Sequence, residues 1–208
     1  MAVRPVTVER MTRTVPADTV DRRERLLEQI VDYVLENGIA QLTLRSLATA
    51  VGSNNRMLLY YFGSREELVV EALHGAETRF PGMASLFVGL DDRAVPLGDR
   101  LDRVWRVVSD PANLPFHRLF FEIFGLAGFE RERFSTLLGL IGSEWVDAVA
   151  TAFRVSGVGP ERSLLLAHET VAMWRGFQAT LLTGGDAGVV GRVADDALRS
   201  IVERARVD

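Results

Sequence analysis

The strongest constraint on the fold lies in residues 42–68, where two short helix patterns are separated by a single glycine. Leu47 and Ala48 begin an apolar face at helical spacing, and Thr43 stands where an N-cap is expected. Gly52 ends this first pattern, because glycine accepts the left-handed backbone of a tight turn between helices. The spacing therefore predicts a helix-turn-helix.

A second short helix is predicted after this turn, with Asn54 as its N-cap. Leu58 and Phe62 lie four residues apart and place its apolar face inward. Gly63 ends the helix, and the sequence Ser-Arg-Glu-Glu that follows has the spacing of a capping box, which starts a longer helix. The outward positions of the second helix are Asn55, Arg56, Met57, Tyr60 and Tyr61.

The charge of this stretch favours a polyanionic partner. The chain has a formal net charge of -4, yet residues 37–65 contain three arginines and neither Asp nor Glu. Phosphate binding needs positive charge without competing carboxylates, and base reading needs amide or guanidinium groups such as those of Asn54, Asn55 and Arg56. A plain solvated helix face is the alternative. The coincidence of turn, caps and charge favours double-stranded DNA as the partner.

The same residues carry a family resemblance. The pattern resembles the N-terminal domain of the tetracycline-repressor (TetR) family of bacterial regulators, over about a quarter of the chain. The matching residues are Gly38-Ile39, Leu42-Thr43, Arg45, Leu47-Ala48, Gly52, Leu58, Phe62 and Ser64-Arg65-Glu66-Glu67-Leu68. The resemblance implies an all-helical, homodimeric transcriptional regulator whose larger C-terminal domain binds a small effector.

The resemblance also implies roles for single residues. Arg45 falls on a position that can reach a base. Positions that read bases are occupied by Asn55, Arg56 and Met57, and positions that contact phosphate by Thr43, Tyr60, Tyr61 and Arg65. The chain departs from the family pattern at Leu59, where Tyr is usual, at Arg56, where a small residue is usual, and at Arg65, where Lys is usual. Leu59 lacks the hydroxyl for one expected phosphate contact, which the adjacent Tyr60 and Tyr61 could supply instead. Arg56 suggests a preference for guanine.

Composition excludes several classes of protein. The 208 residues are 48% hydrophobic, enough for a substantial core. No apolar run is long enough to cross a membrane, and the N-terminus lacks the apolar segment of a signal peptide, so we expect a cytoplasmic protein without a membrane partner. The absence of cysteine excludes disulfides and thiolate chemistry.

The whole chain is predicted to be all-α, with about nine helices. We expect a flexible arm over residues 1–17, a helix-turn-helix DNA-binding domain over 18–65, and an effector-binding and dimerisation domain over 66–208. A helix from Glu66 to about Phe80 is the candidate lever between the two domains. Residues 81–98 are predicted to be a connection, either without regular structure or with one short helix.

Five further helices follow in the larger domain, and the first of them is expected from Asp99 to Asp110. Pro115 lies in the first turn of one that Gly125 and Gly128 are expected to close, and the next is expected from Glu130 to about Val155. The last two are predicted over residues 161–183 and 186–206. Because both are apolar over a wide arc, we predict that they form the dimer interface, with contacts from Leu164, Val171, Val193, Ala197 and Ile201.

Aromatic residues cluster in the larger domain and allow a pocket for a largely apolar effector. Its candidate lining consists of Trp105, Phe116, His117, Phe120, Phe124, Trp145, Trp174 and Phe177. Polar groups could come from His117, Glu122, His168 or Arg175. The alternative is that these rings only fill the core.

Catalytic and metal-binding patterns are missing from the sequence. The three histidines lie far apart, and we find no phosphate-binding glycine loop and no serine, histidine and carboxylate set at recognisable spacing. We therefore expect no enzymatic activity, no cofactor and no metal. The sequence favours a ligand-responsive regulator, expected to be a repressor, that binds a palindromic operator. An all-helical small-molecule-binding module without operator specificity is the alternative.

Overall fold

The computed structural model describes residues 17–132 and 134–206, and all regular structure in these ranges is helical. The predicted all-α class is thus confirmed. The helices are α1 Ala17–Asn37, α2 Leu44–Ala50, α3 Asn55–Phe62, α4 Arg65–Thr78, α5 Pro81–Ala84, α6 Leu97–Val108, the 3-10 helix η1 Pro111–Asn113, α7 Leu114–Phe129, α8 Ser135–Val155, α9 Pro160–Leu182 and α10 Ala187–Ala205. The predicted arm lies outside the described residues except for Ala17, which begins α1.

The described residues form ten α-helices, where about nine were expected, and the difference is the short helix α5. Pro81 occupies its first turn, where the missing N–H of proline costs nothing. Met83 is buried and holds this turn against the core. Of the two predictions for residues 81–98, the one with a short helix is therefore confirmed.

Two predicted helix boundaries differ from the structure. Helix α7 continues through Gly125, the first of the two glycines expected to close it, and ends at Phe129, one residue after the second. The buried face continues past the first glycine with Ala127, so packing outweighs the cost of about 1 kcal/mol that glycine carries inside a helix. Helix α8 begins at Ser135 rather than at Glu130.

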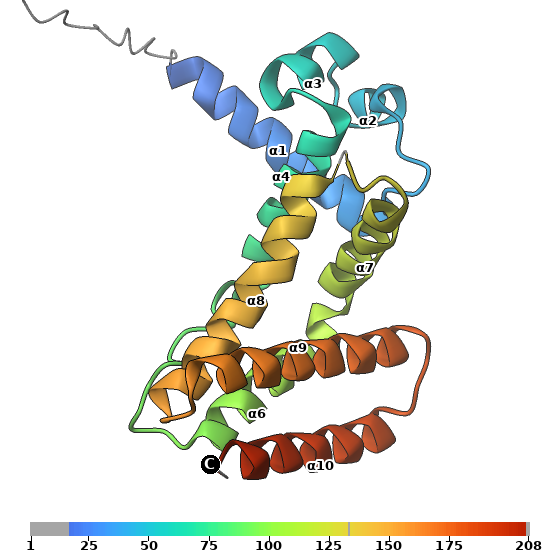
Figure 1. Ribbon diagram of the computed structural model, residues 1–208. Coiled ribbons are helices and arrows are strands. Elements are labelled where there is room, and N and C mark those ends of the chain that lie inside the picture. Colours follow the sequence, from blue (N-terminus) through green and yellow to red (C-terminus); the bar gives the residue numbers. More distant parts are fainter. Residues whose placement is uncertain (1–16, 133, 207–208) are drawn as a thin grey trace, which may run out of the picture.

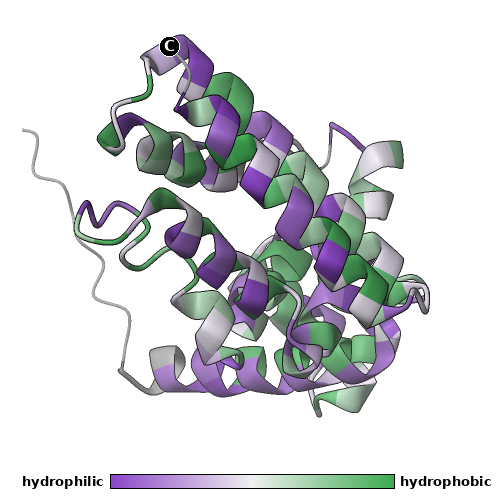
Figure 2. Ribbon diagram, turned by 90° about the horizontal axis from the view of Figure 1, so that it is seen from below, coloured by the Kyte–Doolittle hydropathy of each residue, from purple (hydrophilic) through white to green (hydrophobic). Residues whose placement is uncertain are grey.

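The described residues form an elongated molecule, as Figure 1 shows. Helices α2 and α3 lie at one end and α10 lies at the opposite end. Helices α7 and α8 run between these ends, and α9 crosses beside α10. Apolar and polar residues alternate along the helices in Figure 2, as expected for helices that each bury one face.

The hydrophobic core is continuous from Leu26 in α1 to Val202 in α10. Helix α1 packs along α4, and this contact is reinforced at the surface by ion pairs from Arg23 to Glu71 and from Arg79 to Asp32. Helix α4 also contacts α3, α5 and α7, so it joins the helix-turn-helix to the larger helical region. Within the described residues, none of the helices is both long and apolar enough to cross a membrane.

Candidate DNA-binding surface and effector site

The turn between α2 and α3 has the backbone geometry that its sequence predicts. Gly52 adopts a φ of +61°, a conformation that side chains disfavour. Its N–H donates to the carbonyl of Thr49 at 3.3 Å, and the N–H of Ser53 donates to the carbonyl of Ala48 at 2.8 Å. These two bonds form the Schellman motif, which ends α2 and turns the chain sharply into α3.

Side-chain caps fix the starts of the helices on either side of this turn. The Thr43 hydroxyl accepts from the N–H of Ser46 at 3.0 Å, and the Asn54 carbonyl oxygen accepts from the N–H of Met57 at 3.0 Å. The capping box from Ser64 to Glu67 is present at the start of α4. All three predicted caps are confirmed, so α2 and α3 are held by bonds within a few residues of the turn.

The predicted DNA-binding residues lie together on α2, α3 and the residues that flank them. The buried residues Leu58 and Phe62 anchor α3 and turn the rest of the helix outward. Met57, Tyr61 and Arg65 are half-buried. The exposed members of the set are Thr43, Arg45, Asn54, Asn55, Arg56 and Tyr60. We call this set of nine the reading surface.

Two members of the reading surface also hold the backbone in place. Nε of Arg65 donates to the carbonyl of Leu42 at 3.2 Å, which ties the start of α4 to the loop before α2. The carbonyl of Tyr61 accepts from Nε of Arg23 at 3.3 Å. The side chain of Leu59, at the position that departs from the family pattern, is 43% exposed and adds an apolar group beside Tyr60.

The aromatic residues predicted to line a pocket divide into two groups by exposure. Trp105, Phe116, His117, Phe120 and Trp174 are buried, whereas Phe124, Trp145 and Phe177 are partly exposed. Ring pairs connect the two groups: the centroids of Trp105 and Phe177 are 5.6 Å apart, and Phe120 stacks on Phe124 at 6.0 Å. Trp105 also borders a groove between α6 and α10 whose other walls are mainly charged.

Arg175 joins three of these helices. It extends from α9, and its guanidinium carbon lies 5.8 Å from the ring centroid of Phe124 in α7 and 5.9 Å from that of Trp145 in α8. Burial lowers the pKa of Arg175. These distances fit cation–π contacts, so the charge sits among rings rather than in open solvent.

A buried polar pair lies close to these rings. Nε2 of Gln178 is 3.3 Å from Nδ1 of His117, a distance at which the amide donates to a neutral imidazole. Burial lowers the pKa of His117 to about 4, and the Val108 carbonyl opposes part of the shift. Among the described residues, Oε1 of Gln178 and the indole N–H of Trp174 have no hydrogen-bond partner. Gln178 and Trp174 thus place an unpaired acceptor and an unpaired donor in the core beside these rings.

Sequence reasoning missed Gln178, although its spacing gave a usable signal. Ala167, Val171, Trp174 and Gln178 follow one another at helical spacing, and all four are buried. Two other predicted polar groups lie elsewhere: His168 is exposed on α9, and Glu122 hydrogen-bonds to the turn after α1. The prediction for Glu122 as a pocket residue is therefore corrected.

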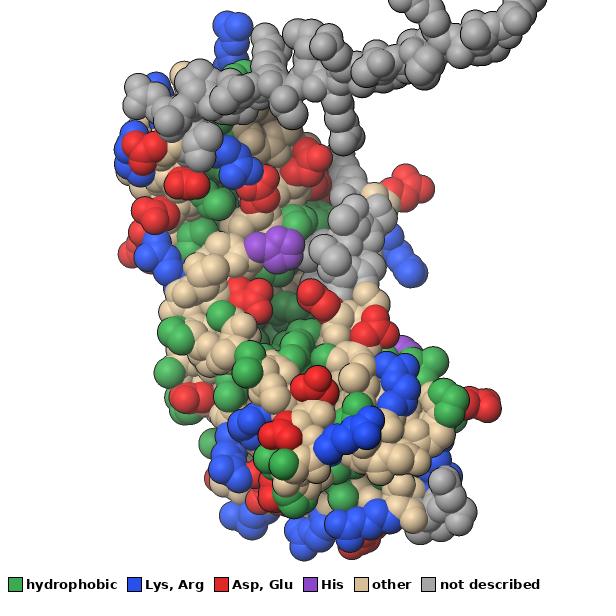
Figure 3. Space-filling view, turned by 90° about the vertical axis from the view of Figure 1, so that its left-hand side faces the viewer, with side chains coloured by type: hydrophobic (Ala, Val, Ile, Leu, Met, Phe, Trp, Pro, Cys, Tyr) green, Lys and Arg blue, Asp and Glu red, His purple; other side chains and the backbone are tan. Residues whose placement is uncertain are grey.

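Acidic side chains also occur in the larger region. The pKa of Glu77 in α4 is raised by burial and by Glu144 in α8, while His74 opposes the shift. Figure 3 shows a hollow with a hydrophobic floor and acidic side chains beside it, on the face that points to the left in Figure 1. In the described part of the chain, His, Asp and Glu side chains do not gather in a group that could hold a metal ion.

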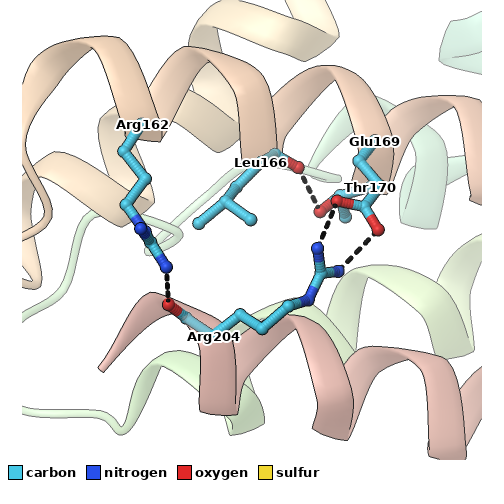
Figure 4. A network of polar contacts seen from close by, with 5 residues as sticks. All are labelled: Arg162, Leu166, Glu169, Thr170 and Arg204. Carbon is cyan, nitrogen blue, oxygen red and sulfur yellow. Dashed lines mark hydrogen bonds and ion pairs between the residues drawn. The ribbon is translucent and has the colours of Figure 1, made fainter. Parts of the chain in front are cut away.

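Helices α9 and α10 pack side by side and expose apolar residues. Arg204 pairs with both carboxylate oxygens of Glu169, at 3.0 and 2.5 Å, and Arg162 donates to the carbonyl of Arg204 (Figure 4). These contacts fix α9 against α10. The large apolar residues that remain exposed on the pair are Leu164, Leu165, Val189 and Val193.

The predicted dimer residues on α9 and α10 are not all exposed. Leu164 and Val193 are 45% and 48% exposed, and Ala197 is half-buried. Val171 and Ile201 are only 1% and 2% exposed, because they pack in the chain's own core. A partner helix could not reach them, so the predicted interface is corrected at these two positions.

Three solved structures illustrate what this fold is similar to. The multidrug-binding protein EbrR, solved with imidazole, is 23% identical with a TM-score of 0.67, over 94% of this chain and 97% of that one. A transcriptional regulator from Rhodococcus sp. Rha1 is 15% identical with a TM-score of 0.70, over 89% and 98%. A TetR-like transcriptional regulator from Rhodococcus sp. RHA1 is 17% identical with a TM-score of 0.60, over 88% and 94%.

Comparison at the level of sequence gives a different result. The chain matches no family model and no curated protein. The similarity to solved structures nevertheless spans nearly the full length of both chains, including the helix-turn-helix and the larger helical region. The chain therefore has the fold of the TetR-family transcriptional regulators.

Proposed function

We propose that this chain is a DNA-binding transcriptional regulator that binds a palindromic operator as a homodimer. The observation that carries the proposal is the reading surface itself: α3, capped by Asn54, presents Asn55, Arg56 and Tyr60 to solvent at one end of the molecule. Amide and guanidinium groups can bond to base edges in the major groove, and the surface has no carboxylate to repel phosphate. The fold shared with known regulators supports the same function.

Exposed apolar residues on α9 and α10 support the homodimer. Leu164, Leu165, Val189 and Val193 would be buried between two copies of this helix pair. Ala172 and Gly176, exposed on α9, are small enough to let helices approach closely. Twofold symmetry would place two reading helices in successive major grooves, about 34 to 36 Å apart, which requires a palindromic site.

We further propose that a small, largely apolar effector binds among the rings of α6 to α9 and releases the DNA, so that the regulator acts as a repressor. Phe124, Trp145 and Phe177 are partly exposed, and Gln178 and Trp174 supply polar groups nearby. EbrR, a multidrug-binding protein with a similar fold, was solved with imidazole, which is consistent with a small-molecule site. An effector that binds more tightly when the separation of the two reading helices differs from the one that fits the operator would weaken DNA binding by linkage.

Selection of bound duplexes from a random library, at a stated salt concentration, tests this function. We expect an inverted repeat whose two halves are about one helical turn apart. A screen for compounds that release the selected duplex would then test the effector. A purified dimer that shows no preference over random competitor DNA would contradict the proposal, and compound binding without DNA preference would instead indicate a small-molecule-binding module.

A further inference from the structure

Glu122 connects the helix that carries the aromatic residues to the turn before the helix-turn-helix. It lies on α7, and its two carboxylate oxygens accept from consecutive backbone amides after α1. Oε2 accepts from the N–H of Ile39 at 2.9 Å, and Oε1 accepts from the N–H of Ala40 at 2.5 Å. The partners are more than eighty positions apart in the sequence, so this contact joins two separate parts of the chain.

The turn is shaped to receive this carboxylate. Gly38 has a φ of +70°, and a Cβ at this position would lie 2.6 Å from Oε2 of Glu122. A side chain here would therefore be strained by the backbone and would also displace the carboxylate. Ile39 and Leu42, on either side of Ala40, are buried, which anchors the rest of the turn in the core.

Other side chains of α7 take part in the candidate effector site. His117 contacts Gln178, and Phe120 stacks on Phe124, which lies under the guanidinium of Arg175. Because α7 is one continuous helix, a shift that alters these contacts also moves Glu122. Hydrogen bonds to an ionised carboxylate are stronger than those between neutral groups, so the turn would follow the helix.

We propose that Glu122 is a positioning residue that fixes the orientation of the α1–α2 turn on α7 and thereby sets the separation of the two reading surfaces in the dimer. This inference rests on the proposed function. It assigns α7 a coupling role alongside α4, the lever expected from the sequence. Without the Glu122 contact, each reading surface keeps the side chains that contact bases and phosphates. The separation between the two reading surfaces, however, is no longer fully fixed.

Hydrogen exchange of the full-length protein tests the contact without any DNA. Glu122→Gln keeps the shape of the side chain but replaces one acceptor oxygen by an N–H group. We expect the amides of Ile39 and Ala40 to exchange about tenfold faster or more in this variant. Glu36→Gln is the matched control, because it removes the same charge from an exposed position on α1 close to the turn. Unchanged exchange at both amides in Glu122→Gln would overturn the inference.

DNA binding tests the positioning role. We would compare the selected inverted repeat with duplexes in which one base pair is added or removed between the half-sites. The wild type and Glu36→Gln should prefer the selected spacing, whereas Glu122→Gln should reduce this preference by about fivefold or more, the lower end of typical coupling between sites. Gly38→Ala, which disturbs the same contact from the other side, should reduce it as well.

The outcomes separate this inference from the proposed function. A wild type that prefers no duplex would contradict the proposed function and, with it, the positioning role. A wild type that is selective, with Glu122→Gln weakening all spacings by the same factor, would show that Glu122 is merely structural and would overturn the inference alone. Faster exchange together with a reduced spacing preference would support it.

Discussion

The reading surface and the α6–α10 region hold their functional side chains in opposite ways. At the reading surface, polar groups are exposed, and the helices that carry them are fixed by caps three residues away, as with Asn54 and Met57. In the α6–α10 region, polar groups are buried and their partners are remote, as with His117 and Gln178, 61 positions apart. Substitutions of the exposed residues can therefore alter DNA specificity at little cost in stability. Substitutions of the buried residues require the surrounding core to repack.

The largest expected effect comes from preventing dimer formation through α9 and α10, which leaves the residues of the reading surface unchanged. Leu165→Glu combined with Val193→Glu would place carboxylates in the proposed dimer interface, where burying an unpaired charge is costly. We expect monomers in light scattering and operator binding weaker by about 100-fold or more, because the two half-sites would no longer be bound together. Val88→Glu, at a valine that is 70% exposed outside α9 and α10, is the control and should remain dimeric. A dimeric double variant would contradict the proposed interface.

The next effect concerns the buried histidine. The folded-state pKa of His117, about 4, lies below its ordinary value of 6.5, so its contribution to stability is present above the ordinary pKa and is lost as pH falls toward 4. Between pH 7 and pH 5 the wild type should lose about 2 kcal/mol of unfolding free energy through this group. Urea unfolding of His117→Gln should lack that part of the loss. Equal pH dependence in both proteins would show that the imidazole is not held neutral.

A smaller effect is expected at the cap of α3. Asn54→Ala removes the acceptor for the N–H of Met57 and should lower the unfolding free energy by about 1 kcal/mol, while Asn54→Asp should retain most of it. Asn55→Ala is the matched control, since Asn55 lies inside the helix and alanine is the better helix former. Its stability should not fall, although its DNA binding should. A loss of stability in both variants would argue against a separate capping role.

These predictions also show why the sequence predicted one region better than the other. The turn at Gly52 and the caps at Thr43, Asn54 and Ser64 depend on residues within a few positions, so their spacing was sufficient. The end of α7 depends on what Ala127 packs against, which spacing does not show. The glycine signal therefore failed at Gly125, where tertiary packing was stronger.

The candidate effector and dimer sites could be predicted only in part from the sequence. Helical spacing indicates that one face of α9 or α10 is buried, but it does not tell the chain's own core from a partner, which explains the corrections at Val171 and Ile201. Glu122 reads as one polar residue among aromatics, and only the folded chain brings it to the amides of Ile39 and Ala40. Gln178 was within reach of the sequence pattern and was overlooked.

The most direct test of the central claim compares Arg56→Ala with Arg154→Ala on the selected duplex and on its single-base variants. Arg56 is exposed on α3, and Arg154 is an exposed arginine on α8, away from the reading surface. The account predicts that Arg56→Ala loses about 1 to 3 kcal/mol on the selected site and relaxes preference at one base position, while Arg154→Ala binds like the wild type. Equal affinity of all three proteins, or the same loss in both variants on every duplex, would contradict it.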